Sequence, residues 1–117
     1  MYSITTSNVT VMVTNVDRAI EFYKAIGLEL KQRWNNYFAQ VAAPGVIIGL
    51  HPAGIGNNAS TNVPIGVGVE NLEDVRMRLK ELNVKFTESA DKAGDFIGFQ
   101  DPDGTPLYFM QSKIGEW

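Results

Sequence analysis

The chain has 117 residues, of which 44% are hydrophobic, and this length and composition suit one compact domain with a proper core. It contains no cysteine, which excludes disulfides and thiolate metal sites. The net charge is −3 and the two signs are interspersed, so no basic stripe is available to neutralise nucleic-acid phosphates. The N-terminus lacks a signal-peptide pattern, and no apolar stretch is long enough to cross a bilayer. We therefore expect a cytoplasmic protein that binds neither nucleic acid nor membrane.

The first half of the chain reads as a strand, a helix and three further strands. Valines at alternate positions over residues 8–13 have the period of a strand with two different faces. Asn15 can then cap a helix whose apolar stripe runs to Ile26, and Gly27 follows where a helix end favours a left-handed residue. Two-residue turns at Asn35-Asn36 and Pro44-Gly45 would join the next strands as hairpins. The expected strands are 28–34, 37–43 and 46–51.

The same order of elements starts again after residues 52–62, which are rich in glycine and asparagine and predict a linker. A strand at 64–69 precedes a helix that Asn71 can cap. The later strands are expected at 84–88, 94–100 and 105–111. A shift of 56 positions superimposes the two opening strands and helices, and the shift becomes 59 toward the last hairpin. This pattern predicts an internal repeat; the alternative is two unrelated α+β segments whose strand–helix junctions look alike. We expect a single domain over 1–117, with one module at about 4–51 and another at about 63–112.

Two segments, one in each half, resemble a known superfamily. The first is the strand and helix over 8–23 together with Ile26-Gly27-Leu28, and the second is the turn and strand start over 99–107. Both resemble the vicinal-oxygen-chelate superfamily, which contains glyoxalase, bleomycin-resistance and extradiol-dioxygenase relatives. The resemblance implies an α+β fold in which two βαβββ modules pair about a pseudo-twofold axis. Their sheets would form a curved mixed sheet around a shared cleft, with the helices outside.

Strand parity predicts which side chains line this cleft. On the first strand the valines would face the helix, while Asn8, Thr10 and Met12 would face the cleft. A two-residue loop at Pro44-Gly45 would place Gln40 opposite Gly49 and Phe38 opposite His51, and opposed residues share a face.

In the second module, the alternation on the last strand would turn Tyr108 and Met110 toward the cleft. A four-residue turn at 101–104 would add Ile97 and Phe99, whereas a bulge there would break this assignment. Arg33 is a further polar candidate. The predicted ligand-binding residues are Asn8, Thr10, Met12, Phe38, Gln40, His51, Phe99, Tyr108 and Met110.

This lining combines aromatic and apolar walls with a few polar groups, a composition that suits a small organic ligand. Gly49, Gly66 and Gly68 would leave volume open; the alternative is that aromatic rings plug the cleft and the glycines admit close packing. Asp101 and Asp103 are expected to shape their turn through side-chain-to-backbone hydrogen bonds rather than to act as an acid–base pair.

The resemblance also indicates where a metal would bind. In metal-dependent relatives the ligands come from the first and last strands of each module, which places them here at Asn8, Gly49, Pro64 and Tyr108. Glycine and proline offer no side-chain ligand, and asparagine and neutral tyrosine are poor ligands for a transition metal. We therefore expect no metal and no cofactor.

His51, the only histidine, is the one candidate catalytic residue. It is interpreted as a general base, a ligand anchor or part of a displaced metal site. The alternative is a strand-end histidine satisfied by water or a carbonyl group.

The leading hypothesis is a metal-free small-molecule-binding protein of the glyoxalase/bleomycin-resistance type that sequesters a drug or metabolite. The relatives that bind antibiotics are homodimers, so the resemblance implies a homodimer, with Trp34, Trp117 and the edge strands as candidate interface. One alternative is a metal-dependent glyoxalase-like lyase or isomerase, or an extradiol dioxygenase, which would need a divalent metal. Another is a structural or regulatory partner protein whose cleft is filled.

Overall fold

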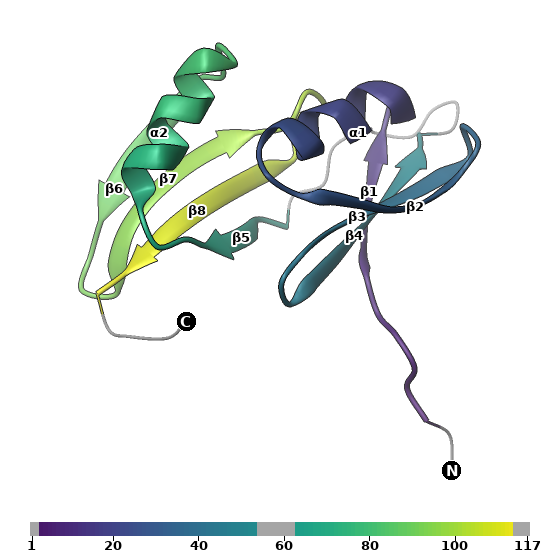
Figure 1. Ribbon diagram of the computed structural model, residues 1–117, viewed down its shortest axis with the longest axis horizontal. Coiled ribbons are helices and arrows are strands. Elements are labelled where there is room, and N and C mark those ends of the chain that lie inside the picture. The colour runs from purple at the N-terminus through teal and green to yellow at the C-terminus, as the bar shows by residue number, and fades with distance from the viewer. Residues whose placement is uncertain (1–2, 54–62, 114–117) are drawn as a thin grey trace. The chain divides into compact units, whose positions relative to one another are not determined.

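The computed structural model describes residues 3–53 and 63–113, so most of the expected linker and Trp117 lie outside the described residues. The chain divides into two compact units, Met1–Ser60 and Thr61–Trp117, each of which contains one βαβββ module (Figure 1). The predicted order of elements is therefore confirmed in both halves.

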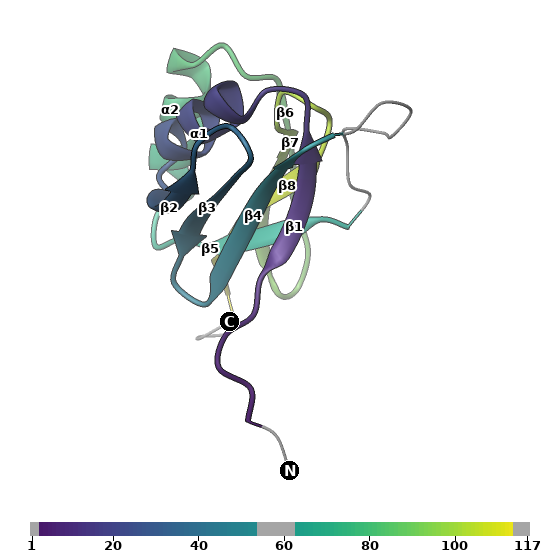
Figure 2. The same ribbon diagram turned by 90° about the vertical axis from the view of Figure 1, so that its right-hand side faces the viewer.

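The first unit is a four-stranded mixed sheet with one helix. Its elements are β1 (Val9–Val13), α1 (Val16–Ala25), β2 (Glu29–Trp34), β3 (Phe38–Ala43) and β4 (Val46–Pro52). The strands lie side by side in the order β1-β4-β3-β2, with β1 parallel to β4 and the other pairs antiparallel (Figure 2).

The second unit repeats this topology. Its elements are β5 (Ile65–Gly68), α2 (Leu72–Glu81), β6 (Phe86–Ala90), β7 (Gly94–Gln100) and β8 (Pro106–Ser112). The strand order is β5-β8-β7-β6, and β5 runs parallel to β8. Thr10 pairs with Gly49 in the first unit and Gly66 pairs with Tyr108 in the second, as the shifts of 56 and 59 positions predict.

The two helices begin in the same way, because each is preceded by an extended asparagine whose side chain accepts a backbone N–H. The Asn15 Oδ1 atom accepts from Arg18 N at 3.0 Å, and the Asn71 Oδ1 atom accepts from Glu73 N at 2.9 Å. Beyond α1, Gly27 has a φ of 113°, and beyond α2, Asn83 has a φ of 57°. Both helices therefore stop at a left-handed residue, as the sequence predicts for the first helix at Gly27.

Each unit has its core between the helix and one face of the sheet. The buried side chains of the first unit include Val11, Val13, Val16, Ala19, Ile20, Tyr23, Ala39, Val41, Ile48 and Leu50. Those of the second unit include Ile65, Leu72, Val75, Leu79, Ile97, Phe99, Leu107 and Phe109. Alternate residues of every central strand thus face the helix, which fixes the residues on the opposite face. Val9 is an exception among the valines of β1, because it is exposed.

The turn between β7 and β8 differs from the expected four-residue turn. Asp101 N donates to Thr105 O at 3.0 Å and Gly104 N donates to Asp101 O at 3.0 Å, so the strands are closed by Asp101 and Thr105 around a three-residue loop. Gly104 has a φ of 90°, the left-handed conformation of a bulged hairpin loop. The Asp101 carboxylate accepts from Asp103 N and Thr105 N, both at 2.9 Å, which confirms its expected role in shaping the turn.

This one-residue difference reverses the predicted orientation of Phe99. Phe99 pairs with Leu107, and Gly98 pairs with Tyr108. Phe99 is therefore on the helix side, 6% exposed, with its ring centroid 5.7 Å from that of Phe109. The prediction that it lines a ligand site is wrong, and the same register places Ile97 in the core.

Candidate functional site

The faces of the two sheets that point away from their own helices, here called the helix-free faces, hold most of the predicted site residues. In the first unit this face contains Thr10, Met12, Glu29, Gln32, Trp34, Phe38, Gln40, Ala42, Ile47, Gly49 and His51. In the second unit it contains Gly66, Gly68, Thr87, Ser89, Phe96, Gly98, Pro106, Tyr108 and Met110. The exposed Asn8 lies just before β1, where its Oδ1 atom accepts a hydrogen bond from Thr10 Oγ1 at 3.1 Å.

Four rings form a connected cluster on the first of these faces, here called the ring cluster. The ring centroids of Trp34 and Phe38 are 5.3 Å apart with planes tilted by 32°. The His51 ring lies 6.2 Å from Phe38 and 5.3 Å from Tyr37. Trp34 is 45% exposed and Tyr37 is 69% exposed, so the ring cluster presents aromatic surface outward from the unit.

Sequence reasoning identified Phe38 and His51 but did not place Trp34 and Tyr37 beside them. The expected two-residue Asn35-Asn36 turn would have opposed Trp34 to Tyr37. Instead Trp34 pairs with Phe38, and Tyr37 N donates to Trp34 O at 3.0 Å within a three-residue loop. The available signal was the pair of consecutive aromatic residues at 37 and 38, which follows Trp34 after only two asparagines.

Two glycines lie directly beneath aromatic rings of their own unit. A Cβ atom at Gly49 would lie 2.8 Å from Phe38 Cζ and 3.0 Å from Thr10 Oγ1. A Cβ atom at Gly66 would lie 2.2 Å from Tyr108 Cζ. The expected open volume is therefore not present above these two residues, and close packing of rings on glycine is what the structure shows there. Phe96 continues the apolar surface of the second unit, with its ring centroid 6.0 Å from that of Tyr108.

Polar groups on the first helix-free face are uncharged around the ring cluster. Gln40 lies between Gly49 and Gln32 on the neighbouring strands. The His51 Nδ1 atom lies 2.9 Å from the carbonyl oxygen of Pro52. Since a carbonyl oxygen only accepts, Nδ1 carries the proton in this contact. The carbonyl contact foreseen for a strand-end histidine is thus present at one nitrogen of the ring.

Arg33, the further polar candidate, does not join this face. It pairs with Ala39, whose side chain faces α1. Arg33 Nη2 lies 2.5 Å from Asp17 Oδ1 at the start of α1, and Arg33 Nε donates to Asn35 O at 2.7 Å. The arginine therefore ties the edge strand to the helix, and its assignment to the site is wrong.

The four positions that the superfamily uses for a metal do not fit a divalent cation in this chain. Gly49 and Pro64 have no donor side chain, and Phe38 occupies the space above Gly49. The Tyr108 ring lies across Gly66, and the Asn8 amide oxygen is engaged by Thr10. Over residues 3–53 and 63–113, no three histidine, cysteine, aspartate or glutamate side chains gather closely enough to hold a metal ion. A metal site built from firm N and O ligands would need other residues.

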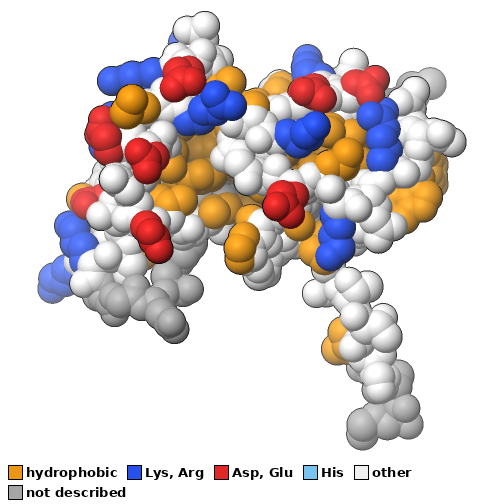
Figure 3. Space-filling view, in the orientation of Figure 1, with side chains coloured by type: hydrophobic (Ala, Val, Ile, Leu, Met, Phe, Trp, Pro, Cys, Tyr) orange, Lys and Arg blue, Asp and Glu red, His pale blue; other side chains and the backbone are white. Residues whose placement is uncertain are grey.

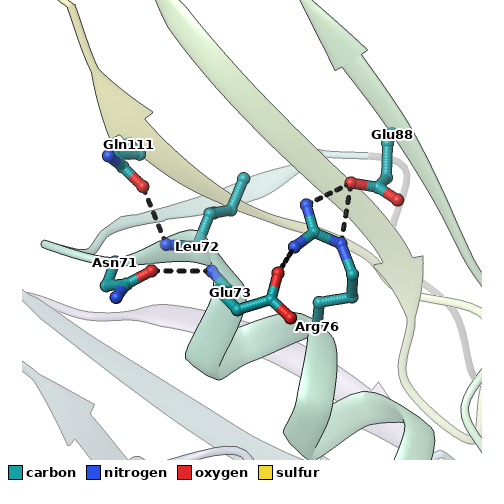
Figure 4. A network of polar contacts seen from close by, with 6 residues as sticks. All are labelled: Asn71, Leu72, Glu73, Arg76, Glu88 and Gln111. Atoms are coloured by element: carbon teal, nitrogen blue, oxygen red, sulfur yellow. Dashed lines mark hydrogen bonds and ion pairs between the residues drawn. The ribbon is translucent and has the colours of Figure 1, made fainter.

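The second unit has a cavity of about 500 Å³ beside the start of α2, which sequence reasoning missed. Arg76 projects from α2 between two carboxylates, where its Nε donates to Glu88 Oε1 at 3.0 Å and its Nη1 pairs with Glu73 (Figure 4). The hydrogen bond to Arg76 lowers the pKa of Glu88, and the same bond raises the pKa of Arg76. Gln111 Oε1 accepts from Leu72 N at 2.8 Å. These contacts hold α2 on the sheet and leave the guanidinium charge paired.

Charge on the face of the molecule seen in Figure 3 is mixed, with basic and acidic side chains interspersed over both units. No continuous basic surface appears there for a phosphate backbone to follow. In the part of the chain that the structure describes, neither helix has the length and apolar character needed to cross a membrane.

Comparisons with known proteins agree with this architecture. The structure is similar to lactoylglutathione lyase from Agrobacterium tumefaciens, with 12% sequence identity, a TM-score of 0.76 and 97% of each chain covered. It is similar to the fosfomycin resistance protein FosX from Listeria monocytogenes, with 19% identity, a TM-score of 0.77 and 97% of each chain covered. The bleomycin resistance determinant encoded on transposon Tn5 has 14% identity and a TM-score of 0.70, over 95% of this chain and 100% of that one.

At these levels of identity the solved structures show the fold alone. No curated protein sequence matches the chain. The sequence model described as Glyoxalase/Bleomycin resistance protein/Dioxygenase superfamily matches residues 6–109, which is most of the chain. With the duplicated βαβββ unit found in both halves, this match identifies the protein as a member of the glyoxalase/bleomycin resistance protein/dioxygenase superfamily.

Proposed function

We propose that this protein binds a small organic molecule without a metal; a neighbour by fold is named as a bleomycin resistance determinant. The observation that carries the proposal is the ring cluster, which presents Trp34, Phe38 and His51 on one sheet face beside uncharged polar groups. Aromatic surface with a few polar groups is the composition of sites that bind small ligands. The ligand would lie against these rings, because the space above Gly49 is already filled.

A bound molecule would gain most by covering the exposed tryptophan. The ring centroids of Trp34 and Phe38 are 5.3 Å apart and the ring planes are tilted by 32°, so a planar ligand can contact both rings. Burying aromatic surface in this way contributes about 25 cal/mol for each Å² removed from water. Thr10, Gln32 and Gln40 supply hydroxyl and amide groups on the same face.

An enzyme that depends on a divalent metal is the competing function, since the neighbours by fold include a lyase. The side chains at Asn8, Gly49, Pro64 and Tyr108 argue against it, because they supply no firm ligand. A partner protein with a filled cleft is the other alternative, and the rings lying on Gly49 and Gly66 favour it. We also propose a homodimer, with Trp34 at the end of edge strand β2 as a candidate contact.

Binding can be tested by a thermal-shift screen of planar aromatic and aliphatic compounds, followed by calorimetry on the compounds that stabilise the protein. The Trp34→Ala variant should weaken binding of aromatic compounds about tenfold, because their principal stacking surface is removed. Met77→Ala is the matched control, since Met77 is also an exposed apolar side chain but lies on α2. Unchanged affinity in Trp34→Ala, or no stabilising compound at all, would reject the proposal.

A further inference from the structure

We infer that the ligand carries an N–H or O–H donor on an uncharged planar ring, and that the His51 Nε2 atom accepts this hydrogen bond. The inference deepens the proposed function and rests on it. It begins with the tautomer, because Nδ1 donates to Pro52 O at 2.9 Å. In a neutral imidazole the other nitrogen is then an acceptor.

The Nε2 atom has no hydrogen-bond partner among the described residues. His51 is half-buried on the helix-free face, and within residues 3–53 and 63–113 its only hydrogen bond is the one to Pro52. The rings of Tyr37 and Phe38 flank the imidazole and limit its rotation. A donor that approaches Nε2 therefore meets an acceptor held beside an aromatic surface. This geometry favours a ligand that has both an aromatic ring and a hydrogen-bond donor on that ring.

The surroundings favour a neutral donor over a cation. Met12 pairs with His51 across the β1–β4 ladder. On the other side of β4, Phe38 is one residue before Ala39, which pairs with Leu50. Both neighbours of His51 are uncharged. Thr10 and Gln40, one step further along, are also uncharged. Among the described residues of the first unit, strand pairing places one carboxylate, Glu29, on this face, and it pairs with Ala42 at the opposite end of β2 from Trp34. An ammonium group at the ring cluster would therefore lose hydration and gain no ionic partner. Phenols, indoles and other N–H heteroaromatics have the required chemistry.

Indole and benzofuran test the inference directly, because they have nearly the same shape and differ in one N–H donor. The wild-type protein should bind indole about tenfold more tightly than benzofuran, as expected when one hydrogen bond on a half-exposed site is lost. His51→Phe retains a flat ring but has no acceptor, so it should bind the two probes equally. Trp34→Ala should weaken both probes by a similar factor and keep their ratio.

A spectroscopic measurement on the wild type makes the test independent of any variant. His51 is the only histidine, so its ring nitrogens can be assigned without ambiguity in ¹⁵N spectra. Nε2 should appear unprotonated in the free protein and shift when indole, but not benzofuran, is added. Three results would overturn this inference while leaving the proposed function standing. They are a preference for indole that persists in His51→Phe, equal affinities of the wild type for the two probes, and a protonated Nε2 in the neutral ring. Failure of both probes to bind would overturn the proposed function with it.

Discussion

At Gly66 the absence of a side chain is what allows the Tyr108 ring to lie against the backbone of β5. The hydroxyl oxygen of that ring would be 2.4 Å from an added Cβ atom, and ring carbon Cζ would be closer still. Contacts this short cannot be kept, so any larger residue must displace the ring.

The Gly66→Ala variant is accordingly expected to lose about 1–3 kcal/mol of unfolding free energy, measured by urea denaturation. Gly98→Ala is the control, since Gly98 pairs with Tyr108 from the other side and an added Cβ atom would be 3.5 Å from Thr87 Oγ1. The unfolding free energy of Gly98→Ala should differ from that of the wild type by no more than about 0.5 kcal/mol. Equal losses in the two variants would show that the Tyr108 ring moves aside at little cost.

Asp101 offers a second residue-scale prediction, because its buried carboxylate holds the loop between β7 and β8 by two backbone N–H groups. Asp101→Ala leaves both donors without this acceptor and should cost about 1–3 kcal/mol in thermal or urea unfolding. Asp101→Asn keeps an Oδ1 acceptor at the same place, so it should retain much of the lost stability. If the asparagine variant is as unstable as the alanine variant, the negative charge rather than the acceptor geometry holds the loop.

At the scale of elements, the helices and central strands were predictable and the hairpin registers were only partly so. Val11, Val41 and Leu79 had to be apolar because each is buried, and this requirement imposes the periods that the sequence displays. The Pro44-Gly45 turn was predicted correctly, and Gln40 pairs with Gly49 as expected.

The loop after β2 contains one residue more than expected, and the loop after β7 contains one residue fewer. A one-residue change reverses the face of every residue that follows, so the errors at Trp34 and Phe99 have the same physical origin. Nothing in the Asp-Pro-Asp-Gly or Asn-Asn sequences specifies the loop length, because both sequences are compatible with several hairpin turns. The ring cluster depends on such a register, which is why only part of the candidate site could be predicted.

The ion pair between α2 and β6 gives a prediction about pH. Arg76 lowers the pKa of Glu88 in the folded protein, so the ionised carboxylate stabilises the fold at neutral pH. This contribution is present above the pKa of the unfolded glutamate, about 4.3, and is lost as the pH falls through the lower folded value. Arg76→Met should therefore destabilise the protein more at pH 7 than at pH 3, as measured by urea midpoints.

Glu88→Gln is the control for this pH dependence, because it removes the titrating group while keeping the size of the side chain. In a Glu88→Gln background, the effect of Arg76→Met should change much less between pH 7 and pH 3. A pH dependence that persists undiminished would show that the Arg76–Glu88 pair is not its source.

For the whole molecule, the internal repeat could be predicted from the sequence because two copies of one unit must satisfy the same packing requirements. Asn15 and Asn71 cap equivalent helices, and the pairs Thr10–Gly49 and Gly66–Tyr108 occupy equivalent places in the two sheets. What the repeat does not determine is the chemistry of the exposed faces, since side chains there are not constrained by the core.

The metal content of the intact protein is a prediction at this scale. Protein purified without a chelator should contain far less than one equivalent of zinc, nickel, manganese or iron in elemental analysis. The reason is that the four superfamily positions offer at most one amide and one neutral phenol as ligands. Addition of each ion should also leave the melting temperature unchanged. A stoichiometric metal ion that remains bound after dialysis would contradict the proposed metal-free binding protein and favour a metal-dependent enzyme.

The glycines beneath Phe38 and Tyr108 limit which residues the two units could exchange. In the first unit the small residue is on β4 and its covering ring comes from β3, whereas in the second unit the small residue is on β5 and the ring comes from β8. Gly49 and Tyr108 are counterparts, so the position that is small in the first unit carries a ring in the second. Replacing a single residue by its counterpart from the other half would thus create either a collision or a void. Only an exchange of neighbouring pairs would keep the volume filled.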